Sequence, residues 1–372
     1  MPNRSWTVGE IRLTGPLRAV CQNHSQIECN FVAIFDLTSE DLENTNIVIL
    51  QRIASPFIER VAKELIKKQI PYIYEIDDLL WDMPKTLLSA SAWDRNKERL
   101  FFLLKNAFAI TTSTQNIADK LYTFNSNIHI IPNVLGKSFS PPRRFNANAK
   151  LILSATDRMY IESISGALKK LQKLYSTEIV AIGPVAKDLA KKGISVKEIP
   201  VMELNEYSEF LASCENFIGL CPLDDTAFSQ CKSTVKYQSY ALAGIPVIAS
   251  NKEPYSTVIK HEFNGFLIAD DSENSWFEAI RLHFENPELL DKYTKNSLNV
   301  LRDMDDPVLL WYNLLIDVYR KHPAQIHNLK LPSSWTWKYL RYLLSVEKYV
   351  ALLRLVRQYG IRKIFYLLRK GM

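Results

Sequence analysis

Short apolar runs rich in β-branched residues alternate with helical patterns along most of this chain, and this alternation constrains its fold more than any other feature. The first five predicted strands are Cys29–Phe35, Asn46–Leu50, Tyr72–Ile76, Ala107–Thr112 and Ile128–Ile131. Helical patterns cover Pro56–Lys68 and Trp93–Lys105. Strands that alternate with helices form parallel sheets covered on both faces, so this half of the chain predicts one α/β domain.

The same alternation restarts after residues 136–148, a loop rich in Pro, Ser and Arg. Its strands are predicted at Lys150–Ser154, Glu178–Ile182, Val196–Ile199, Phe217–Leu220 and Pro246–Ala249, with a helix through Ile164–Tyr175. A chain of 372 residues is long enough for two such domains. Paired α/β domains bind ligands where the carboxyl ends of their strands meet a cleft, so the residues after each strand are candidate site residues.

Composition and charge exclude several classes of protein. The five cysteines are widely spaced without a C-x-x-C pair, which indicates a reducing compartment and no structural zinc. The net charge of +6 lies mainly in Trp335–Met372, where nine Lys and Arg stand against one Glu, so no nucleic-acid partner is expected for the nearly neutral remainder. With no secretory signal pattern and no apolar run of membrane-spanning length, a cytoplasmic location is predicted.

Adjacent carboxylates follow the predicted strand Tyr72–Ile76. Asp77 and Asp78 at a strand end are suited to metal binding, to general base catalysis or to orienting substrate hydroxyls. The alternative, of equal weight, is that one of them caps the following turn or helix. At the end of the next strand, Ser113 or Thr114 is expected to cap a helix.

Two lysines mark the start of a predicted helix in the second half of the chain. Lys232 and Lys236 are four residues apart, hence on one helix face, and Ser233 and Thr234 are residue types found at helix starts. Free backbone N–H groups beside two cations suit a diphosphate. A capped surface helix with two solvated lysines explains the same residues about equally well.

Three consecutive segments resemble the glycosyltransferases of family 4, which are retaining enzymes with the GT-B fold. These segments are Tyr240–Ser250, Glu253–Tyr255 and Asn264–Ile268. The strand ends Tyr74–Leu80 and Thr111–Thr114 resemble a bacterial branch of the family that decorates polysaccharides. The resemblance covers roughly residues 47–319 and implies an α/β GT-B fold, in which two Rossmann-like αβα domains face each other across a cleft.

The resemblance also implies a division of the chain. Residues 1–140 would form the acceptor domain, and residues 148–300 the domain that binds the nucleotide-sugar donor. Residues 301–330 would form a crossover helix back to the first domain, and residues 331–372 a basic amphipathic helical tail. The strand that opens this fold would have to be the atypical Arg4–Val8, unless the chain is a piece of a longer protein.

The same resemblance implies roles for site residues. Asp77 and Asp78 would be the catalytic residues on the acceptor side. The donor site would contain Lys232, Ser233 and Lys236 at the diphosphate, together with Arg158, Gly183 and Ser239. No metal or other cofactor is required in such a site, because cations and a helix N-terminus neutralise the leaving diphosphate.

Two departures from the family pattern concern the donor. The paired glutamates of the family fall at Cys231 and Ser239, and the second of them usually binds the ribose hydroxyls. The Gly-Arg pair after the first strand of the donor domain is also absent, and Arg158 would supply its cation from a shifted position. The alternatives to an ordinary enzyme are therefore a catalytically silent glycan-binding or scaffold module and a transferase with an atypical donor.

The predicted function is transfer of a sugar from a nucleoside diphosphate sugar to a cell-surface polysaccharide or a lipid-linked oligosaccharide, with retention of anomeric configuration. Residues 335–370 combine aromatic side chains with nine cations at helical spacing. This pattern suits an anionic membrane surface, a partner domain, or packing against the body of the protein. The first of these would place the protein on the inner face of the plasma membrane.

Overall fold

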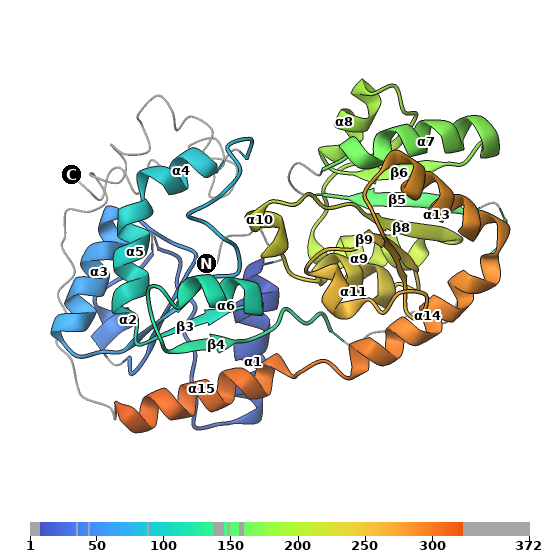
Figure 1. Ribbon diagram of the computed structural model, residues 1–372. Coiled ribbons are helices and arrows are strands. Elements are labelled where there is room, and N and C mark those ends of the chain that lie inside the picture. Colours follow the sequence, from blue (N-terminus) through green and yellow to red (C-terminus); the bar gives the residue numbers. More distant parts are fainter. Residues whose placement is uncertain are drawn as a thin grey trace, which may run out of the picture.

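The structure is a computed structural model that describes residues 8–34, 36–43, 45–87, 89–136, 145–147, 149–155 and 160–322. Each of its two lobes is built around a parallel sheet, and the last described helices run from the second lobe back along the first (Figure 1). This is the predicted α/β architecture. The predicted tail, residues 331–372, lies outside the described residues.

Four parallel strands form the amino-terminal sheet: β1 (Val48–Gln51), β2 (Tyr72–Glu75), β3 (Ala109–Thr112) and β4 (Ile128–Ile130). They lie side by side in chain order, and Ile73 pairs with Ile49 on one side and with Ala109 on the other. The two central strands are buried throughout, which explains why apolar residues begin both of them, whereas Glu75 and Thr112 at their carboxyl ends are buried polar residues. All four were predicted to within two residues at either end.

The helices of this lobe include α2 (Glu40–Glu43), α3 (Pro56–Lys67), α4 (Ala90–Arg95), α5 (Lys97–Asn106) and α6 (Gln115–Leu121). The Ser55 hydroxyl caps α3 by accepting a hydrogen bond from the Ile58 amide (3.2 Å), and Pro56 occupies the first turn, where no amide donor is needed. The apolar face of α3 packs into the core of the lobe.

Two predicted elements of this lobe are wrong. Cys29–Phe35 is not a strand: the described residues 29–34 pair with no other strand, and Cys29 and Phe31 pack against an apolar cluster that contains Trp311. The apolar character of this run therefore reflects contact with a helix. The predicted helix Trp93–Lys105 is broken at Asn96, where a φ/ψ of −110°/11° ends α4 before α5 begins.

The described chain begins in a helix instead of a strand. A π-helical turn, η1 (Glu10–Thr14), continues into α1 (Gly15–Asn23). Val8, the last residue of the predicted strand Arg4–Val8, already has helical conformation, and the other residues of that strand lie outside the described part.

The crossover helix joins the two lobes. After α14 (Pro287–Arg302) in the second lobe, α15 (Pro307–Lys321) runs along the first lobe beside α1 (Figure 1). Trp311 of α15 is fully buried there, in a cluster with Leu17 and Val20 of α1. This contact fastens the end of the described chain to its beginning.

Six parallel strands form the second sheet: β5 (Lys150–Ser154), β6 (Ile179–Ile182), β7 (Lys197–Ile199), β8 (Phe217–Cys221), β9 (Val247–Ser250) and β10 (Phe266–Ile268). The five predicted strands are confirmed, and β10 is an additional one. Their spatial order, β7-β6-β5-β8-β9-β10, reverses direction between β5 and β8. In a doubly wound sheet this switch point is where ligands bind.

Helices cover both faces of the second sheet. They are α7 (Glu162–Tyr175), α8 (Val185–Lys191), α9 (Leu204–Ser213), α10 (Ala227–Gln230), α11 (Val235–Leu242), α12 (Tyr255–Val258) and α13 (Glu273–Glu285). α7 and α13 pack against each other on one apolar core, while α11 belongs to a second core with β8 and β9. The boundaries assigned to the two domains, at residues 140 and 148, stay predictions.

Candidate functional site

Oppositely charged side chains gather at the carboxyl edge of the amino-terminal sheet. Arg52 follows β1, and Asp77 and Asp78 follow β2, which pairs with β1 in parallel. The Arg52 guanidinium lies 2.9 Å from a carboxylate oxygen of Asp77 and 3.0 Å from one of Asp78. The φ of Arg52 is 43°, in the left-handed region, so the chain turns sharply at this point. Arg52 therefore holds both predicted catalytic carboxylates.

A second ion pair, close to the first, is fully buried. Arg12 Nε lies 2.7 Å from a Glu75 carboxylate oxygen, and neither side chain is exposed. The Arg12 guanidinium also donates to the Ile131 carbonyl and to Asn133 Oδ1 (2.9 Å), and the Arg12 carbonyl accepts from the indole of Trp311 (3.0 Å). One arginine thus connects the start of the described chain, the end of β2, the segment after β4 and the crossover helix.

The two adjacent aspartates have opposite pKa shifts. Burial raises the pKa of Asp77 to about 6; Arg52 opposes this rise, whereas Asp78 and Glu75 add to it. Burial also acts to raise the pKa of Asp78, but Lys232 and Arg52 outweigh it and hold that pKa below its usual value. Asp77 is therefore the carboxylate that can exchange a proton near neutral pH, while Asp78 stays ionised.

In the second lobe, the first turn of α11 carries a lysine whose charge is not neutralised by any described side chain. Lys236 is half-buried near Cys221 at the end of β8, burial lowers its pKa, and it has no ion-pair or hydrogen-bond partner within the described ranges. No described side chain caps α11, so backbone N–H groups of that turn are available to an anion. By contrast, Lys252 after β9 pairs with Asp225 (2.9 Å) and Asp271 (2.5 Å).

Lys232 connects the second lobe to the acidic cluster of the first. Its ammonium lies 3.1 Å from a carboxylate oxygen of Asp78 and 4.1 Å from the centre of the Phe228 ring. Phe228 and Cys231 are buried in the apolar core of the amino-terminal lobe, and the side-chain amide of Asn116 in α6 donates to the Gln230 carbonyl (2.8 Å). Residues 227–232 are therefore a docking segment, a part of the second lobe that packs on the first, and α10 lies between the lobes (Figure 1).

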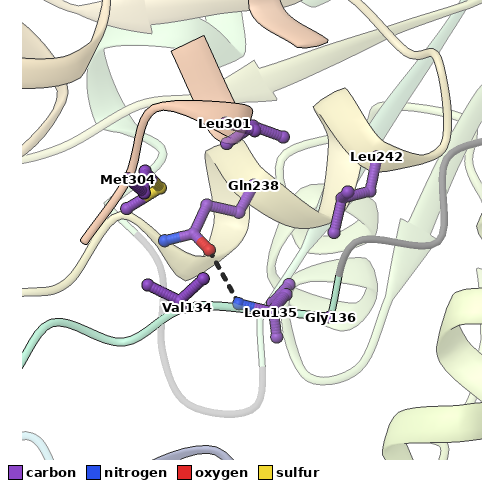
Figure 2. A pocket seen from close by; sticks show the side chains of 7 residues that line it. All are labelled: Val134, Leu135, Gly136, Gln238, Leu242, Leu301 and Met304. Atoms are coloured by element: carbon purple, nitrogen blue, oxygen red, sulfur yellow. Dashed lines mark hydrogen bonds between the residues drawn. The ribbon is translucent and has the colours of Figure 1, made fainter. Parts of the chain in front are cut away.

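A buried glutamine fastens the segment after β4 to α11. Gln238 donates from Nε2 to the Asn133 carbonyl (2.6 Å) and accepts at Oε1 from the Leu135 amide (3.0 Å), the bond drawn in Figure 2. A small pocket beside it is lined by Val134, Leu135, Gly136, Gln238, Leu242, Leu301 and Met304 (Figure 2). This lining is apolar apart from Gln238, so the pocket suits packing between the connection and α11 instead of a charged ligand.

The remaining predicted donor residues follow strands or precede α11. Gly183 comes directly after β6 with a φ of 84°, and a Cβ there would lie 2.1 Å from the Ala155 carbonyl oxygen, so glycine is required. Ser233 lies in the turn before α11. Arg158 lies outside the described residues. The donor roles of these three residues stay predictions.

The two positions of the missing glutamates are both occupied by buried side chains. Cys231 is fully buried in the core of the amino-terminal lobe, and burial raises the pKa of its thiol to about 11. Ser239 is buried, and its hydroxyl donates to the Val235 carbonyl one turn earlier in α11 (2.8 Å). Neither side chain presents a carboxylate to a ribose, which agrees with the departure seen in the sequence.

Three residues of this region were not predicted from the sequence. Arg52 follows a predicted strand, so the rule that selected Asp77 could have selected it as well. Arg12 and Gln238 had no local signal, because their main partners are 63 and 105 positions away in the chain. Long-range contacts of this kind appear only once the fold is known.

The described residues contain no group of three or more His, Cys, Asp or Glu side chains placed to hold a metal ion. The acidic cluster instead has cationic side chains as its counterions. In the described ranges, no helix has both the length and the apolar character needed to cross a bilayer.

Comparison with known proteins gives the class of the fold. Residues 240–300 match the family model described as Glycosyl transferases group 1, and no curated protein sequence matches the chain. Similar solved structures include HepE of Anabaena in complex with UDP and glucose, with 13% identity over 76% of this chain and 80% of that chain and a TM-score of 0.56. Another is sucrose-phosphate synthase from Thermosynechococcus elongatus, with 13% identity over 74% and 73% and a TM-score of 0.55.

A third similar structure is a mutant of TarM from S. aureus in complex with fondaparinux, alpha-GlcNAc-glycerol and UDP. It has 15% identity over 67% of this chain and a TM-score of 0.50, and this chain spans 50% of its length. The chain thus has the GT-B fold, as the resemblance predicted, and residues 240–300 are similar to group 1 glycosyl transferases. That region runs from the end of α11 through β9, α12, β10 and α13 into α14, and it begins four residues after Lys236.

Proposed function

We propose that this protein is a retaining glycosyltransferase that moves a sugar from a nucleoside diphosphate sugar to a cell-surface polysaccharide or a lipid-linked oligosaccharide. The observation that carries the proposal is Lys236, half-buried without a counterion in the described ranges, at the uncapped start of α11. A diphosphate would supply the missing negative charge and accept hydrogen bonds from the helix N–H groups. The switch point between β5 and β8, where Cys221 approaches Lys236, supports this location.

In this proposal the residues of the two lobes have different roles in the reaction. Lys232, Lys236 and the N–H groups near Ser233 would balance the charge of the leaving diphosphate. Asp77, whose pKa is about 6, is ionised near neutral pH and would accept a proton from the acceptor hydroxyl or orient it. In a retaining transfer the departing phosphate can take this proton, and Asp77 would then act by orientation alone.

A second candidate function is supported by a specific observation. Cys231 is buried in the other lobe and the Ser239 hydroxyl is bonded within its own helix, so the usual carboxylates for the donor are absent from both positions. A module that binds a glycan without catalysis would fit this arrangement, and so would a transferase whose donor is not held through ribose hydroxyls.

Calorimetric titration of the purified chain with UDP, GDP, dTDP and CMP, and with their sugars, tests the proposal. We expect one nucleoside diphosphate to bind, and the Lys232→Ala/Lys236→Ala double variant to lose at least tenfold in affinity. The matched control is Lys187→Ala/Lys295→Ala, which removes two exposed lysines of the same lobe and should leave affinity unchanged. Binding of a glycan without any nucleotide would favour the silent module.

The acceptor and location are proposed on the tail sequence. Nine cations interleaved with aromatic residues in 335–370 favour an anionic membrane surface, where lipid-linked acceptors are found. Flotation of the full chain with vesicles containing an anionic lipid, compared with neutral vesicles, tests this association. Binding that survives deletion of residues 335–370 would assign the contact to another part of the chain.

A further inference from the structure

We propose that Asp78 is an exchangeable counterion: it occupies Lys232 while the donor site is empty and releases this lysine to the diphosphate of the donor. The inference rests on the proposed function, because it requires Lys232 to meet a diphosphate. It goes further by assigning Asp78 a role different from that of Asp77 and by coupling the two lobes through one ion pair.

The pairing pattern around Asp78 allows such an exchange without leaving any charge unpaired. Asp78 has two cationic partners, Arg52 at 3.0 Å and Lys232 at 3.1 Å. Within the described ranges, Asp78 is the one anion paired with Lys232. If Lys232 turns to a phosphate, Asp78 keeps Arg52 and Lys232 gains a new anion, so the large penalty of an unpaired buried charge is avoided.

The surroundings of Lys232 support its ammonium while leaving it accessible. The Phe228 ring lies 4.1 Å from the ammonium, and this cation–π contact does not depend on which anion completes the pair. The Lys232 side chain is 38% exposed, against 16% for Asp78, so a ligand in the cleft can reach the lysine. Lys236, one turn further along, has no described carboxylate to displace.

The exchange would order the binding of the two substrates. With Lys232 withdrawn, one carboxylate oxygen of Asp78 becomes free to accept a hydrogen bond from the acceptor hydroxyl. An acceptor that occupies Asp78 would in turn favour release of Lys232 to the donor, because coupling between two sites is reciprocal. Asp77 would keep its contact with Arg52 throughout, which separates the proton-accepting role of Asp77 from the counterion role of Asp78.

Calorimetric titration with UDP and, separately, with inorganic pyrophosphate tests the exchange. Asp78→Asn removes the competitor of the ligand at Lys232, so we expect both anions to bind roughly fivefold more tightly than to the unaltered chain. Asp82→Asn is the matched control, because Asp82 is an exposed carboxylate four positions later in the same segment. It removes one negative charge without touching Lys232 and should change affinity by less than about twofold.

The Lys232→Ala background completes the test. There Asp78→Asn should no longer increase affinity, because the pair that it breaks is already absent. If Asp78→Asn fails to melt cooperatively, Asp78→Ser takes its place. Equal affinities of Asp78→Asn and Asp82→Asn would overturn the exchange while leaving the proposed function intact. Failure of the folded, unaltered chain to bind any nucleoside diphosphate or pyrophosphate would overturn both.

Discussion

The carboxyl edge of the amino-terminal sheet and the start of α11 in the second lobe differ in how their charges are paired. On the amino-terminal side, Asp77, Asp78 and Glu75 each have an arginine within 3.0 Å. In the second lobe, Lys236 and the first turn of α11, the proposed donor site, have no counterion in the described part of the chain. Since buried charge is costly unless it is paired, the charges of the first region are balanced without a ligand and the charge of Lys236 is not. The acidic edge is thus preorganised by its own arginines, whereas an anion would balance the charge at the start of α11.

The largest effect on stability should come from removing the buried ion pair between Arg12 and Glu75. Arg12→Met would leave Glu75 buried without its cation, and the free energy of unfolding should fall by about 3–5 kcal/mol. Arg18→Met is the matched control, because Arg18 pairs with Glu10 while both side chains are about half exposed. Its loss should cost at most about 1 kcal/mol. Urea denaturation measures both values, and similar losses in the two variants would mean that burial of the pair does not matter.

In the second lobe, the strongest expected loss of stability comes from replacing a glycine, Gly183, whose backbone conformation and contacts leave no room for a side chain. Gly183→Ala would place a Cβ 2.1 Å from the Ala155 carbonyl oxygen at a φ of 84°, and should destabilise the protein by about 3 kcal/mol. Gly193 has a similar φ of 75° but its Cβ would meet nothing closer than 3.9 Å, so Gly193→Ala isolates the cost of the backbone conformation, about 1 kcal/mol. Thermal or urea unfolding distinguishes the two, and equal losses would show that the carbonyl contact relaxes freely.

Asp77 should make stability depend on pH in the direction opposite to most carboxylates. Its folded pKa of about 6 lies above the value of 3.8 for an unperturbed group, so the native state binds the proton more tightly than the unfolded state. The resulting stabilisation is present below about pH 4 and is lost as pH rises through about 6, a change of about 2–3 kcal/mol.

Urea denaturation of the unaltered chain and of Asp77→Asn at pH 4 and pH 7.5 measures this contribution. The asparagine variant lacks it, so relative to that variant the unaltered chain should be less stable at the higher pH than at the lower. Asp78→Asn serves as the opposing control: the pKa of Asp78 is lowered, so its stabilisation is present above about pH 4 and lost in acid. A difference between the unaltered chain and Asp77→Asn that does not vary with pH would rule out the raised pKa.

The strands could be predicted because buried strands require short runs of mostly apolar residues, which can be recognised in the sequence. β8 is buried at every position, as a strand inside a parallel sheet is, and its run without charged residues follows from this burial. Residues 29–34 are also mostly apolar, but the reason is contact with the cluster that contains Trp311. The local sequence does not distinguish this cause from burial in a sheet. The break at Asn96 was equally hidden, since one polar residue within a helical pattern is ordinary.

The candidate site was predictable only where chemistry follows an element directly. Asp77, Asp78, Lys232 and Lys236 stand at the ends or starts of predicted elements, and the structure brings Asp78 and Lys232 together across 154 positions. Their pairing was not predictable, because it depends on how the docking segment 227–232 packs on the other lobe. The raised pKa of Asp77 is likewise a product of burial among neighbours from several elements.

The smallest expected effect comes from a substitution that adds a negative charge at the start of α11. Thr234 stands at the N-cap of α11 without capping it, so Thr234→Asp would add a cap and a negative charge beside Lys236. Thermal unfolding should show a gain of about 0.5–1 kcal/mol. Titration should show that UDP and pyrophosphate bind more weakly, because the aspartate occupies their place.

Thr234→Asn separates charge from capping, since asparagine caps a helix about as well as aspartate but carries no charge. Both variants can accept the hydrogen bond that Gln238 donates to Thr234 (2.9 Å), so the connection between the lobes is kept. If an anion binds at the start of α11 because Lys236 lacks a counterion, only Thr234→Asp should weaken anion binding. If both variants weaken it equally, the free N–H groups of α11, and not the charge of Lys236, are what an anion requires.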